Sequence, residues 1–180
     1  PTPCWLMLND SGEPVPSGIT APWVLKPARQ GSSVGLQLVD DAIQWDTALA
    51  AARKHDERIL CEERIIGREI TVGILANEAL PIVKVSPKAG AYDYQNKYTV
   101  GATEYFCPAD LSTEQAEAIA KLGLKAFDVV GGRDFGRVDM MLDAELSPHV
   151  LEVNTLPGLT ETSLLPMAAA AAGLDFNMLC

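Results

Sequence analysis

The sequence is poor in the residues that disulfides, zinc sites and nucleophilic triads require. Its cysteines are few, lie far apart and show no metal-type spacing: Cys4, Cys61, Cys107 and Cys180. We therefore expect free thiols in a reducing cytoplasm. The two histidines, His55 and His149, are isolated in the chain, so a Ser-His-Asp triad is not expected.

Long apolar runs and an excess of positive charge are also missing. No run is long enough to cross a bilayer, and nothing at the start resembles a signal peptide. The 14 Lys and Arg residues are outnumbered by 24 Asp and Glu residues, which gives a net charge of −10. This balance opposes non-specific nucleic-acid binding, because that affinity comes from cations that neutralise phosphates. One phosphorylated small molecule needs only a few local cations, so the expected partners are small molecules rather than nucleic acid or membrane.

What the chain does have is sufficient for a packed core. It contains 180 residues, of which 48% are hydrophobic and 21% charged, so one domain or two small lobes are expected rather than disorder. The first residue is Pro1 rather than Met, and Cys180 ends what resembles the first turn of an unfinished helix. We therefore expect a fragment or processed form of a longer chain.

Apolar alternation and turn signals predict many short strands and few helices. The expected strands are residues 4–8, 23–27, 35–39, 58–65, 69–75, 80–86, 135–142 and 149–155. The expected helices are residues 40–56, 112–131 and 166–176. Capping boxes open the first two, Asp41 with Gln44 and Ser112 with Gln115. Ile43 is expected on the apolar face of the first helix. Strands joined by hairpins, with few helices, indicate the α+β class.

The strand "HVLEVNT" (149–155) carries an unexpected polar face. Leu151 and Val153 belong in a core, and successive side chains of a strand point to opposite faces. Glu152 and Asn154 therefore point together away from that core. Two such polar side chains on one face of a strand suggest a binding or catalytic role for that face.

The strand 135–142 repeats this pattern, because Arg137 and Asp139 also share one face. If the two strands pair, two carboxylates and a carboxamide gather beside an arginine. Such hard oxygen ligands suit Mg2+ rather than zinc, and the arginine indicates a phosphate nearby. The alternative is a solvated sheet face with Arg–carboxylate pairs, which antiparallel sheets often have.

A Gly-Ser turn, "ARQGSSV", joins two of the predicted strands. Lys26 lies just before it, where its ammonium can reach a phosphate as a point charge. Gly31 and Gly35 are expected to bend the backbone. Ser32 and Ser33, with their N–H groups, can then approach phosphate oxygens. No Gly-Lys-Ser/Thr opens a helix here, so this is not a Walker A loop, and a plain turn is an equal alternative.

Three acids lie around Gly67, where two predicted strands meet: Glu62, Glu63 and Glu69. A crossing from strand to linker can hydrogen-bond a nucleobase through backbone groups. An acid such as Glu69 can then bind the ribose hydroxyls. From the residues alone, surface charges are the simpler interpretation of all three.

Together these stretches resemble the D-alanine–D-alanine ligases of the ATP-grasp superfamily. Five blocks carry the resemblance, in order along the chain: "VLKPARQGSSVG" (24–35), "CEERIIGREITVGIL" (61–75), "YDYQNKY" (92–98), "GRVDMMLD" (136–143) and "LEVNTLPGLTETSLLP" (151–166). The resemblance implies an ATP-grasp fold, with two α+β lobes of mainly antiparallel sheet that hold ATP between them. It also implies a ligase that joins two D-alanines through an acyl phosphate, in peptidoglycan precursor synthesis.

The resemblance implies the nucleotide contacts as well. Lys26 and Lys97 would hold ATP phosphates, with Ser32 and Ser33 in the loop that closes over them. Adenine and ribose would be held by four residues, some through their backbone: Glu62, Glu63, Ile65 and Glu69. The long polar loop around Tyr98 would be a lid, which a labile acyl phosphate requires.

The remaining implied roles concern the metal and the acceptor. Asp139, Glu152 and Asn154 would ligate two Mg2+ ions, for which Mn2+ can substitute. Arg137 would stabilise charge on the transferring phosphoryl group and on the later oxyanion. The second D-alanine would be framed by Arg137, Gly158, Ser163 and Leu164. The expected catalytic set is Arg137, Ser32, Lys97, Tyr98 and Ser163.

By the same resemblance, residues 1–66 would form the central lobe and residues 67–180 the C-terminal lobe. The family's N-terminal domain has no counterpart here, and family members tend to form homodimers. Two alternatives remain: another ATP-grasp carboxylate–amine ligase with a different acceptor, and a nucleotide-binding module without catalysis. The joint presence of Lys26, Lys97 and the metal-ligand set speaks against the second, because such a module does not need them.

Overall fold

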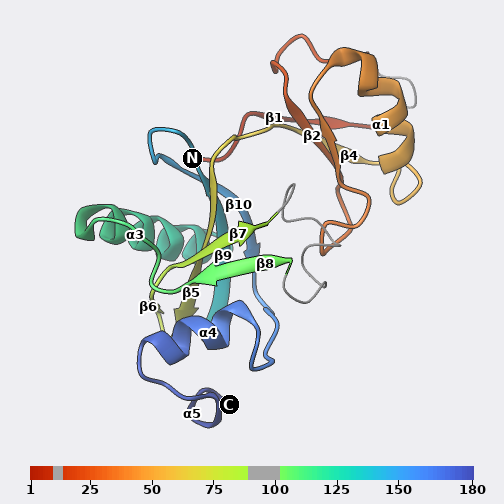
Figure 1. Ribbon diagram of the computed structural model, residues 1–180. Coiled ribbons are helices and arrows are strands. Elements are labelled where there is room, and N and C mark those ends of the chain that lie inside the picture. The colour runs from red at the N-terminus through yellow and green to blue at the C-terminus, as the bar shows by residue number, and fades with distance from the viewer. Residues whose placement is uncertain (10–13, 89–101) are drawn as a thin grey trace. The chain divides into compact units, whose positions relative to one another are not determined.

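The computed structural model describes residues 1–9, 14–88 and 102–180 (Figure 1). The chain divides into two compact units. The small unit contains Pro3–Ile65, and the large unit contains Pro1–Thr2, Ile66–Lys88 and Thr103–Cys180. The division falls after Ile65, one residue before the boundary that the sequence predicts.

Four antiparallel strands form the sheet of the small unit. They are β1 (Trp5–Leu8), β2 (Trp23–Pro27), β3 (Gln37–Val39) and β4 (Ile59–Glu63), in the order β1-β4-β2-β3. β2 lies between β3 and β4, so hydrogen bonds hold it on both sides. Lys26 therefore projects from a fixed central strand.

One helix, α1 (Trp45–Ala52), packs its apolar side against this sheet. The rings of Trp23 and Trp45 meet edge to face with their centroids 5.5 Å apart, an arrangement that aromatic pairs favour. Leu25 and Cys61, paired across β2 and β4, are both fully buried in the same core. Lys26 is the next residue after Leu25 on β2, so its side chain points to the opposite face of the sheet.

The first predicted helix is shorter than expected. Its predicted capping box is present, but a 3-10 turn, η1 (Ala42–Gln44), precedes α1, which ends at Ala52 rather than at residue 56. The buried face of the α-helix therefore begins with Trp45, which is 1% exposed. Ile43 lies in the turn and is 89% exposed, so its predicted place on the apolar face is wrong.

Six strands form the antiparallel sheet of the large unit. They are β5 (Arg68–Leu75), β6 (Glu78–Ala79), β7 (Val83–Pro87), β8 (Thr103–Phe106), β9 (Phe135–Leu142) and β10 (Pro148–Asn154). Their order is β10-β9-β5-β7-β8, and β6 pairs with β5. β6 and β8 were not predicted, because segments of two and four residues show too little alternation to read.

Helices cover both faces of this sheet. α3 (Thr113–Val129) packs on β5, β9 and β10, whereas α4 (Leu164–Ala171) packs on β5 and β7 (Figure 1). A Cβ at Gly123 of α3 would lie 3.0 Å from Val72, and one at Gly73 would lie 3.0 Å from Leu165 of α4. Val72 and Gly73 are neighbours on β5, so α3 and α4 approach opposite faces.

Helix ends were predicted with mixed success. The capping box at Ser112 opens α3 as predicted, and Gly131, with a φ of 71°, follows its end. α4 begins at Leu164 rather than at residue 166, because Ser163 is its N-cap. It ends before Gly173, and a separate short helix, α5 (Phe176–Leu179), follows.

Within the described ranges, no helix is both long enough and apolar enough to span a membrane.

A β-bulge interrupts the pairing of β9 with β10. Val150 pairs with Met140, and Glu152 pairs with Asp139, the next residue along β9. Leu151 is therefore an extra residue on β10 with no counterpart on β9. One extra residue reverses the faces of the residues on either side of it.

The bulge decides which residues of β10 reach the core. Val150 and Val153 both pack against the core under α3, although an odd number of positions separates them. Glu152 and Asn154 take the other face, as predicted. Leu151 is only half-buried and lies outside both core clusters, so its predicted place in the core is wrong.

We expect Leu151→Ala to destabilise the large unit less than Val138→Ala, although it removes more carbon atoms. Val138 is 0% exposed and pairs with Val153, so its truncation leaves a cavity. The expected loss of unfolding free energy is about 2 kcal/mol for Val138→Ala and below about 1 kcal/mol for Leu151→Ala. Chemical denaturation of the two variants measures both values. An equal or larger loss at Leu151 would contradict this placement of the bulge.

Candidate functional site

The polar face of β9 and β10 gathers the three predicted metal ligands, Asp139, Glu152 and Asn154, together with Arg137. Glu152 pairs with Asp139, and Asn154 pairs with Arg137, so the four side chains share one face. The predicted pairing of these two strands is confirmed. Thr71 of β5, which pairs with Asp139, points to the same face, the one on which α4 packs.

Asp139 is the centre of this cluster and is 7% exposed. Arg137 donates two hydrogen bonds to it, from Nε to Oδ1 and from Nη2 to Oδ2, both at 2.8 Å. Thr71 Oγ1 donates to Oδ1 at 2.6 Å, and Asn154 Nδ2 donates to Oδ2 at 3.0 Å. A buried carboxylate is tolerated when it is paired and hydrogen-bonded in this way.

These donors decide the ionisation state of Asp139. Burial alone would raise its pKa, because the charged form loses contact with water. The hydrogen bonds and charge of Arg137, together with the hydroxyl of Thr71, outweigh burial and hold the pKa of Asp139 below its ordinary value. The carboxylate is therefore ionised at neutral pH, as a metal ligand must be.

Glu152 and Asn154 complete an oxygen-rich set of side chains. Asn154 Nδ2 donates to Glu152 Oε1 at 3.2 Å as well as to Asp139, so one carboxamide bridges two carboxylates. Glu152 is exposed and can accept a further partner. Carboxylate and amide oxygens are the ligands that Mg2+ prefers, so the donor set fits this ion.

The fit depends on the carboxamide as the third ligand. No group of three or more His, Cys, Asp or Glu side chains that could hold a metal occurs in residues 1–9, 14–88 and 102–180. Only two carboxylates, Asp139 and Glu152, belong to the set described above. Such a site suits a hard cation that keeps water and substrate oxygens among its ligands.

Thr71 is the member of this cluster that sequence reasoning missed. It is 2% exposed, and its hydroxyl donates the shortest hydrogen bond that Asp139 receives. A weak signal was available, because Glu69 and Thr71 alternate with apolar residues in the central strand "REITVGIL". Polar residues with that period on a buried strand indicate a polar feature on the neighbouring strand.

In the small unit, Lys26 pairs with Glu62. Lys26 Nζ lies 2.5 Å from Glu62 Oε2, and Glu62 is 5% exposed. Glu62 is opposite Val24 on β2, so Lys26, two residues further along, reaches it diagonally on the same face. The interpretation of Glu62 as a surface charge is therefore wrong.

The predicted backbone contacts to adenine fall on a segment whose amides are partly engaged. Glu63 N donates to Cys4 O at 2.8 Å, and Arg64 N donates to Pro22 O at 2.9 Å. A nucleobase contact from these two residues would therefore use their carbonyl oxygens. Ile65 follows directly and ends the small unit.

The other predicted nucleotide residues are distributed over the chain. Glu69 lies on β5 of the large unit, between Val85 of β7 and Met141 of β9. The nucleotide candidates therefore come from both units. Lys97 and Tyr98, predicted for the phosphates and the lid, lie outside the described residues.

The Gly-Ser loop is bent at Gly35, as expected, and at two serines, but not at Gly31. Ser32, Ser33 and Gly35 have positive φ angles of 53°, 59° and 74°, whereas Gly31 does not. Two consecutive serines in the left-handed region are unusual and require support from surrounding structure. Val34 N donates to Gly31 O at 3.1 Å, so the loop closes into a tight turn around the serines.

Three of the four predicted acceptor residues, Gly158, Ser163 and Leu164, lie at the start of α4, whereas Arg137 lies on β9. Ser163 Oγ accepts a hydrogen bond from Thr160 N at 3.1 Å and lies 2.8 Å from Thr160 Oγ1. These contacts hold the "GLTETS" turn against the helix start, with Gly158 at its beginning. Leu164 is 6% exposed, so its side chain packs in the interior and a substrate contact would use its backbone.

The comparisons with known proteins identify the family of the chain. A family model described as "D-ala D-ala ligase C-terminus" matches residues 5–180. The chain belongs to this family. A D-alanine–D-alanine ligase of Methylacidiphilum infernorum is 48% identical over 180 residues, which is 100% of this chain and 58% of that protein. A D-alanine–D-alanine ligase of Aromatoleum aromaticum is 43% identical over 182 residues, with 100% and 59% covered.

Solved structures of a D-alanine–D-alanine ligase and of a D-Ala:D-Ser ligase have the same fold. A crystal structure of the Bacillus anthracis enzyme superposes with a TM-score of 0.85 at 35% identity, and covers 99% of this chain and 59% of that one. The VanG D-Ala:D-Ser ligase of Enterococcus faecalis gives 0.83 at 26% identity, with 99% and 54% covered. The α+β class and the ATP-grasp fold are confirmed. The chain spans somewhat more than half the length of these relatives.

We expect Thr71→Val to destabilise the large unit, because it removes one donor from a buried carboxylate without changing side-chain shape. The expected loss is about 1.5 kcal/mol, near the lower end for hydrogen bonds to charged groups. Thr71→Ser keeps the hydroxyl and should lose less. Equilibrium denaturation of both variants measures the difference. A valine variant as stable as the serine variant would show that the hydroxyl is not needed.

Gly35→Ala is expected to destabilise the small unit. An added Cβ would lie 2.6 Å from His55 Cδ2 and 2.9 Å from Pro27 Cγ, at a residue with a φ of 74°. The expected loss is about 2 kcal/mol, as for other overpacked sites. Gly31→Ala is the matched control, since its Cβ would meet no atom within 4 Å. Similar melting temperatures for the two variants would contradict the close packing of the loop on His55.

Proposed function

We propose that the whole protein is an ATP-dependent ligase that joins two D-alanines, and that this chain supplies its nucleotide and metal site. The observation that carries the proposal is the cluster around Asp139, in which two carboxylates, a carboxamide and an arginine share one sheet face. This is the combination that phosphoryl transfer from a metal-bound nucleotide requires. Membership in the ligase family supports the same conclusion.

The proposed reaction has two steps. A carboxylate oxygen of the first D-alanine attacks the γ-phosphorus of ATP, the bond to the β-phosphate oxygen breaks, and ADP leaves. The amine of the second D-alanine then attacks the acyl carbon and loses a proton, while inorganic phosphate leaves. Both steps need positioning and positive charge more than covalent help from the protein.

Mg2+ is the proposed metal, with Mn2+ as a substitute. Asp139, Glu152 and Asn154 would hold it, and when bound it supplies charge neutralisation to phosphate oxygens. A cation held there would share with Arg137 the same carboxylate oxygens of Asp139. Guanidinium donors that lose this partner become available to a phosphoryl oxygen, which is the role proposed for Arg137.

The remaining residues are proposed to bind and orient substrates. Lys26 and the loop residues Ser32 and Ser33 hold ATP phosphates, with Lys97 as a further cation. Adenine and ribose are bound by four residues: Glu62, Glu63, Ile65 and Glu69. Ser163, Gly158 and the backbone of Leu164 frame the second D-alanine, while Tyr98 lies in the proposed lid. Homodimerisation of the full-length protein and a cytoplasmic location complete the proposal.

A different acceptor is the second candidate. The match to the VanG D-Ala:D-Ser ligase favours it, because that protein has the same fold at 26% identity. Phosphate release by the full-length protein with ATP, compared for D-alanine, D-serine, D-lactate and L-alanine, decides between them. Release that D-alanine does not stimulate would contradict the proposed ligase, and stimulation by another acceptor would favour the second candidate.

Asp139→Asn tests the metal assignment. Loss of one carboxylate is expected to weaken Mg2+ and Mn2+ binding about tenfold or more, a change of about 1.4 kcal/mol or more. Asp134→Asn is the matched control, since its carboxylate lies in the same unit but pairs with the exposed Arg133. Calorimetric titration of each chain with Mn2+ measures the affinity, and circular dichroism checks the fold. Equal affinity in Asp139→Asn and wild type would contradict the assignment.

A further inference from the structure

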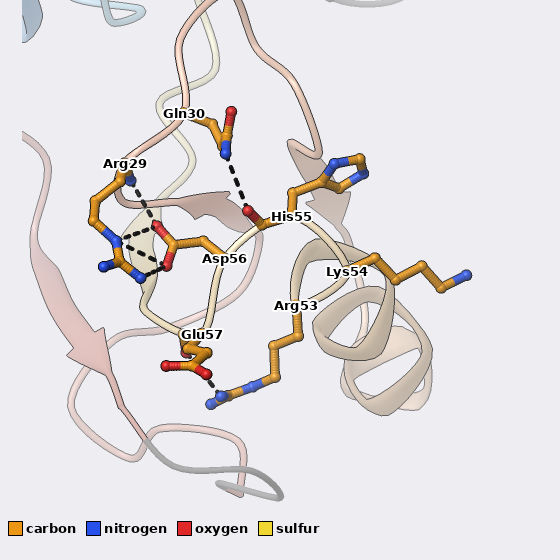
Figure 2. Close-up of a pocket in the computed structure, with 7 residues that line it drawn as sticks. All are labelled: Arg29, Gln30, Arg53, Lys54, His55, Asp56 and Glu57. Atoms are coloured by element: carbon orange, nitrogen blue, oxygen red, sulfur yellow. Dashed lines mark hydrogen bonds and ion pairs between the residues drawn. The ribbon is translucent and has the colours of Figure 1, made fainter.

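The Gly-Ser loop of the small unit is tied to one turn, residues 53–58, which follows α1. Figure 2 shows this turn beside Arg29 and Gln30, which lead into the loop. A cavity of about 470 Å3 opens between them. Most of the polar groups that line this cavity form hydrogen bonds with one another. These bonds connect the turn to the residues that lead into the loop.

Asp56 is the main anchor of this turn, and its side chain is 2% exposed. Its carboxylate accepts three hydrogen bonds from Arg29: from the backbone N at 2.8 Å, from Nη2 at 2.5 Å and from Nε at 3.1 Å. Arg58 N donates to it as well, at 3.1 Å. Both the backbone and the side chain of Arg29 are therefore fixed by one buried group.

This anchor does not depend on pH near neutrality. The hydrogen bond from the Arg29 side chain, with those from the amides of Arg58 and Arg29, holds the pKa of Asp56 far below its ordinary value. A carboxyl group with a lowered pKa keeps its charge until the solution is strongly acidic. The pair with Arg29 therefore persists wherever the protein binds ligands at neutral pH.

Three further contacts join the loop to the same turn. Ala28 N donates to Arg58 O at 2.9 Å, and Gln30 Nε2 donates to His55 O at 3.1 Å. At the other end of the loop, the His55 ring packs against Gly35 so closely that a Cβ there would collide with it. The loop is thus held at both ends by the turn that follows α1.

Such support is what the loop conformation needs. Ser32 and Ser33 both have positive φ angles, which non-glycine residues keep only when neighbouring contacts enforce them. A loop that is already ordered pays less conformational entropy when it binds a phosphate. The contacts of Asp56 therefore bear on nucleotide affinity as well as on folding.

We propose that Asp56 is a positioning residue for nucleotide binding: through Arg29, it holds residues 28–36 in the conformation in which Ser32 and Ser33 meet the phosphates of ATP. The inference rests on the proposed function of this loop. Asp56 itself touches no phosphate, since its carboxylate is enclosed by Arg29 and Arg58. Its effect should consequently appear with nucleotides that carry phosphates and be absent with adenosine.

The test compares Asp56→Asn with wild type in calorimetric titrations of the 180-residue chain with Mg-ATP and with adenosine. The expected result is an affinity for ATP that falls about tenfold, while the affinity for adenosine changes less than about twofold. Asp40→Asn is the control for the loss of an arginine–carboxylate pair, because Asp40 pairs with Arg64 at 2.8 Å in the same unit but has an exposed side chain. It should alter neither affinity.

A second measurement follows the loop without nucleotide. Heteronuclear 15N relaxation should show faster motion of residues 30–35 in Asp56→Asn than in wild type or Asp40→Asn. If Asp56→Asn fails to fold, Arg29→Lys serves instead, since it keeps the positive charge but loses the two-pronged contact. Its loss of ATP affinity should have the same selectivity over adenosine.

The outcomes separate the two proposals. A wild-type chain that binds neither ATP nor adenosine contradicts the proposed function and, with it, this inference. A wild-type chain that binds ATP, with unchanged ATP affinity or unchanged loop motion in Asp56→Asn, overturns the inference alone. Equal losses for ATP and adenosine also overturn it, because they would assign Asp56 a purely structural role.

Discussion

The large unit depends on keeping one carboxylate ionised inside a sheet. Burial opposes the charge on Asp139, and donors from three strands offset it: Arg137 on β9, Thr71 on β5 and Asn154 on β10. Donors from three strands meet one acceptor only if the registers of those strands are fixed relative to one another. A shift of one residue in β5 or β10 would remove the donor of that strand, and only Arg137, which lies on the same strand as Asp139, would stay beside the charge. The ionised carboxylate and the register of the central sheet therefore stabilise each other.

The bulge at Leu151 follows from this constraint. Val150 and Val153 must reach the core under α3, while Glu152 must lie beside Asp139. Unbroken alternation would place Val150 and Glu152 on the same face, which would bury the acid or expose the valine. One extra residue resolves the conflict at the point where the core ends and the polar cluster begins. The bulge thus re-aims Glu152, an effect that bulges commonly have.

Sequence reasoning predicted the features that depend on local periodicity. Arg137 with Asp139, and Glu152 with Asn154, were assigned to one face because each pair is two residues apart on a strand. The predictions for Leu151 and Ile43 were wrong. A bulge and a 3-10 turn change which residues face the core, and neither is visible in the order of apolar and polar residues. Thr71 was missed because its partner is 68 residues away. The roles assigned to the site residues came from the resemblance, and they stay predictions.

Asp56 and Asp139 show how one kind of ion pair can serve two purposes. Each buried carboxylate accepts hydrogen bonds from two guanidinium nitrogens of an arginine, but the remaining donors differ. Asp56 receives backbone amides, which cannot turn away unless the chain path changes. Asp139 receives the side chains of Thr71 and Asn154, and rotation about side-chain bonds can release these donors. Backbone donors therefore make Asp56 a fixed anchor, whereas side-chain donors allow Asp139 to change partners, as the proposed metal site requires.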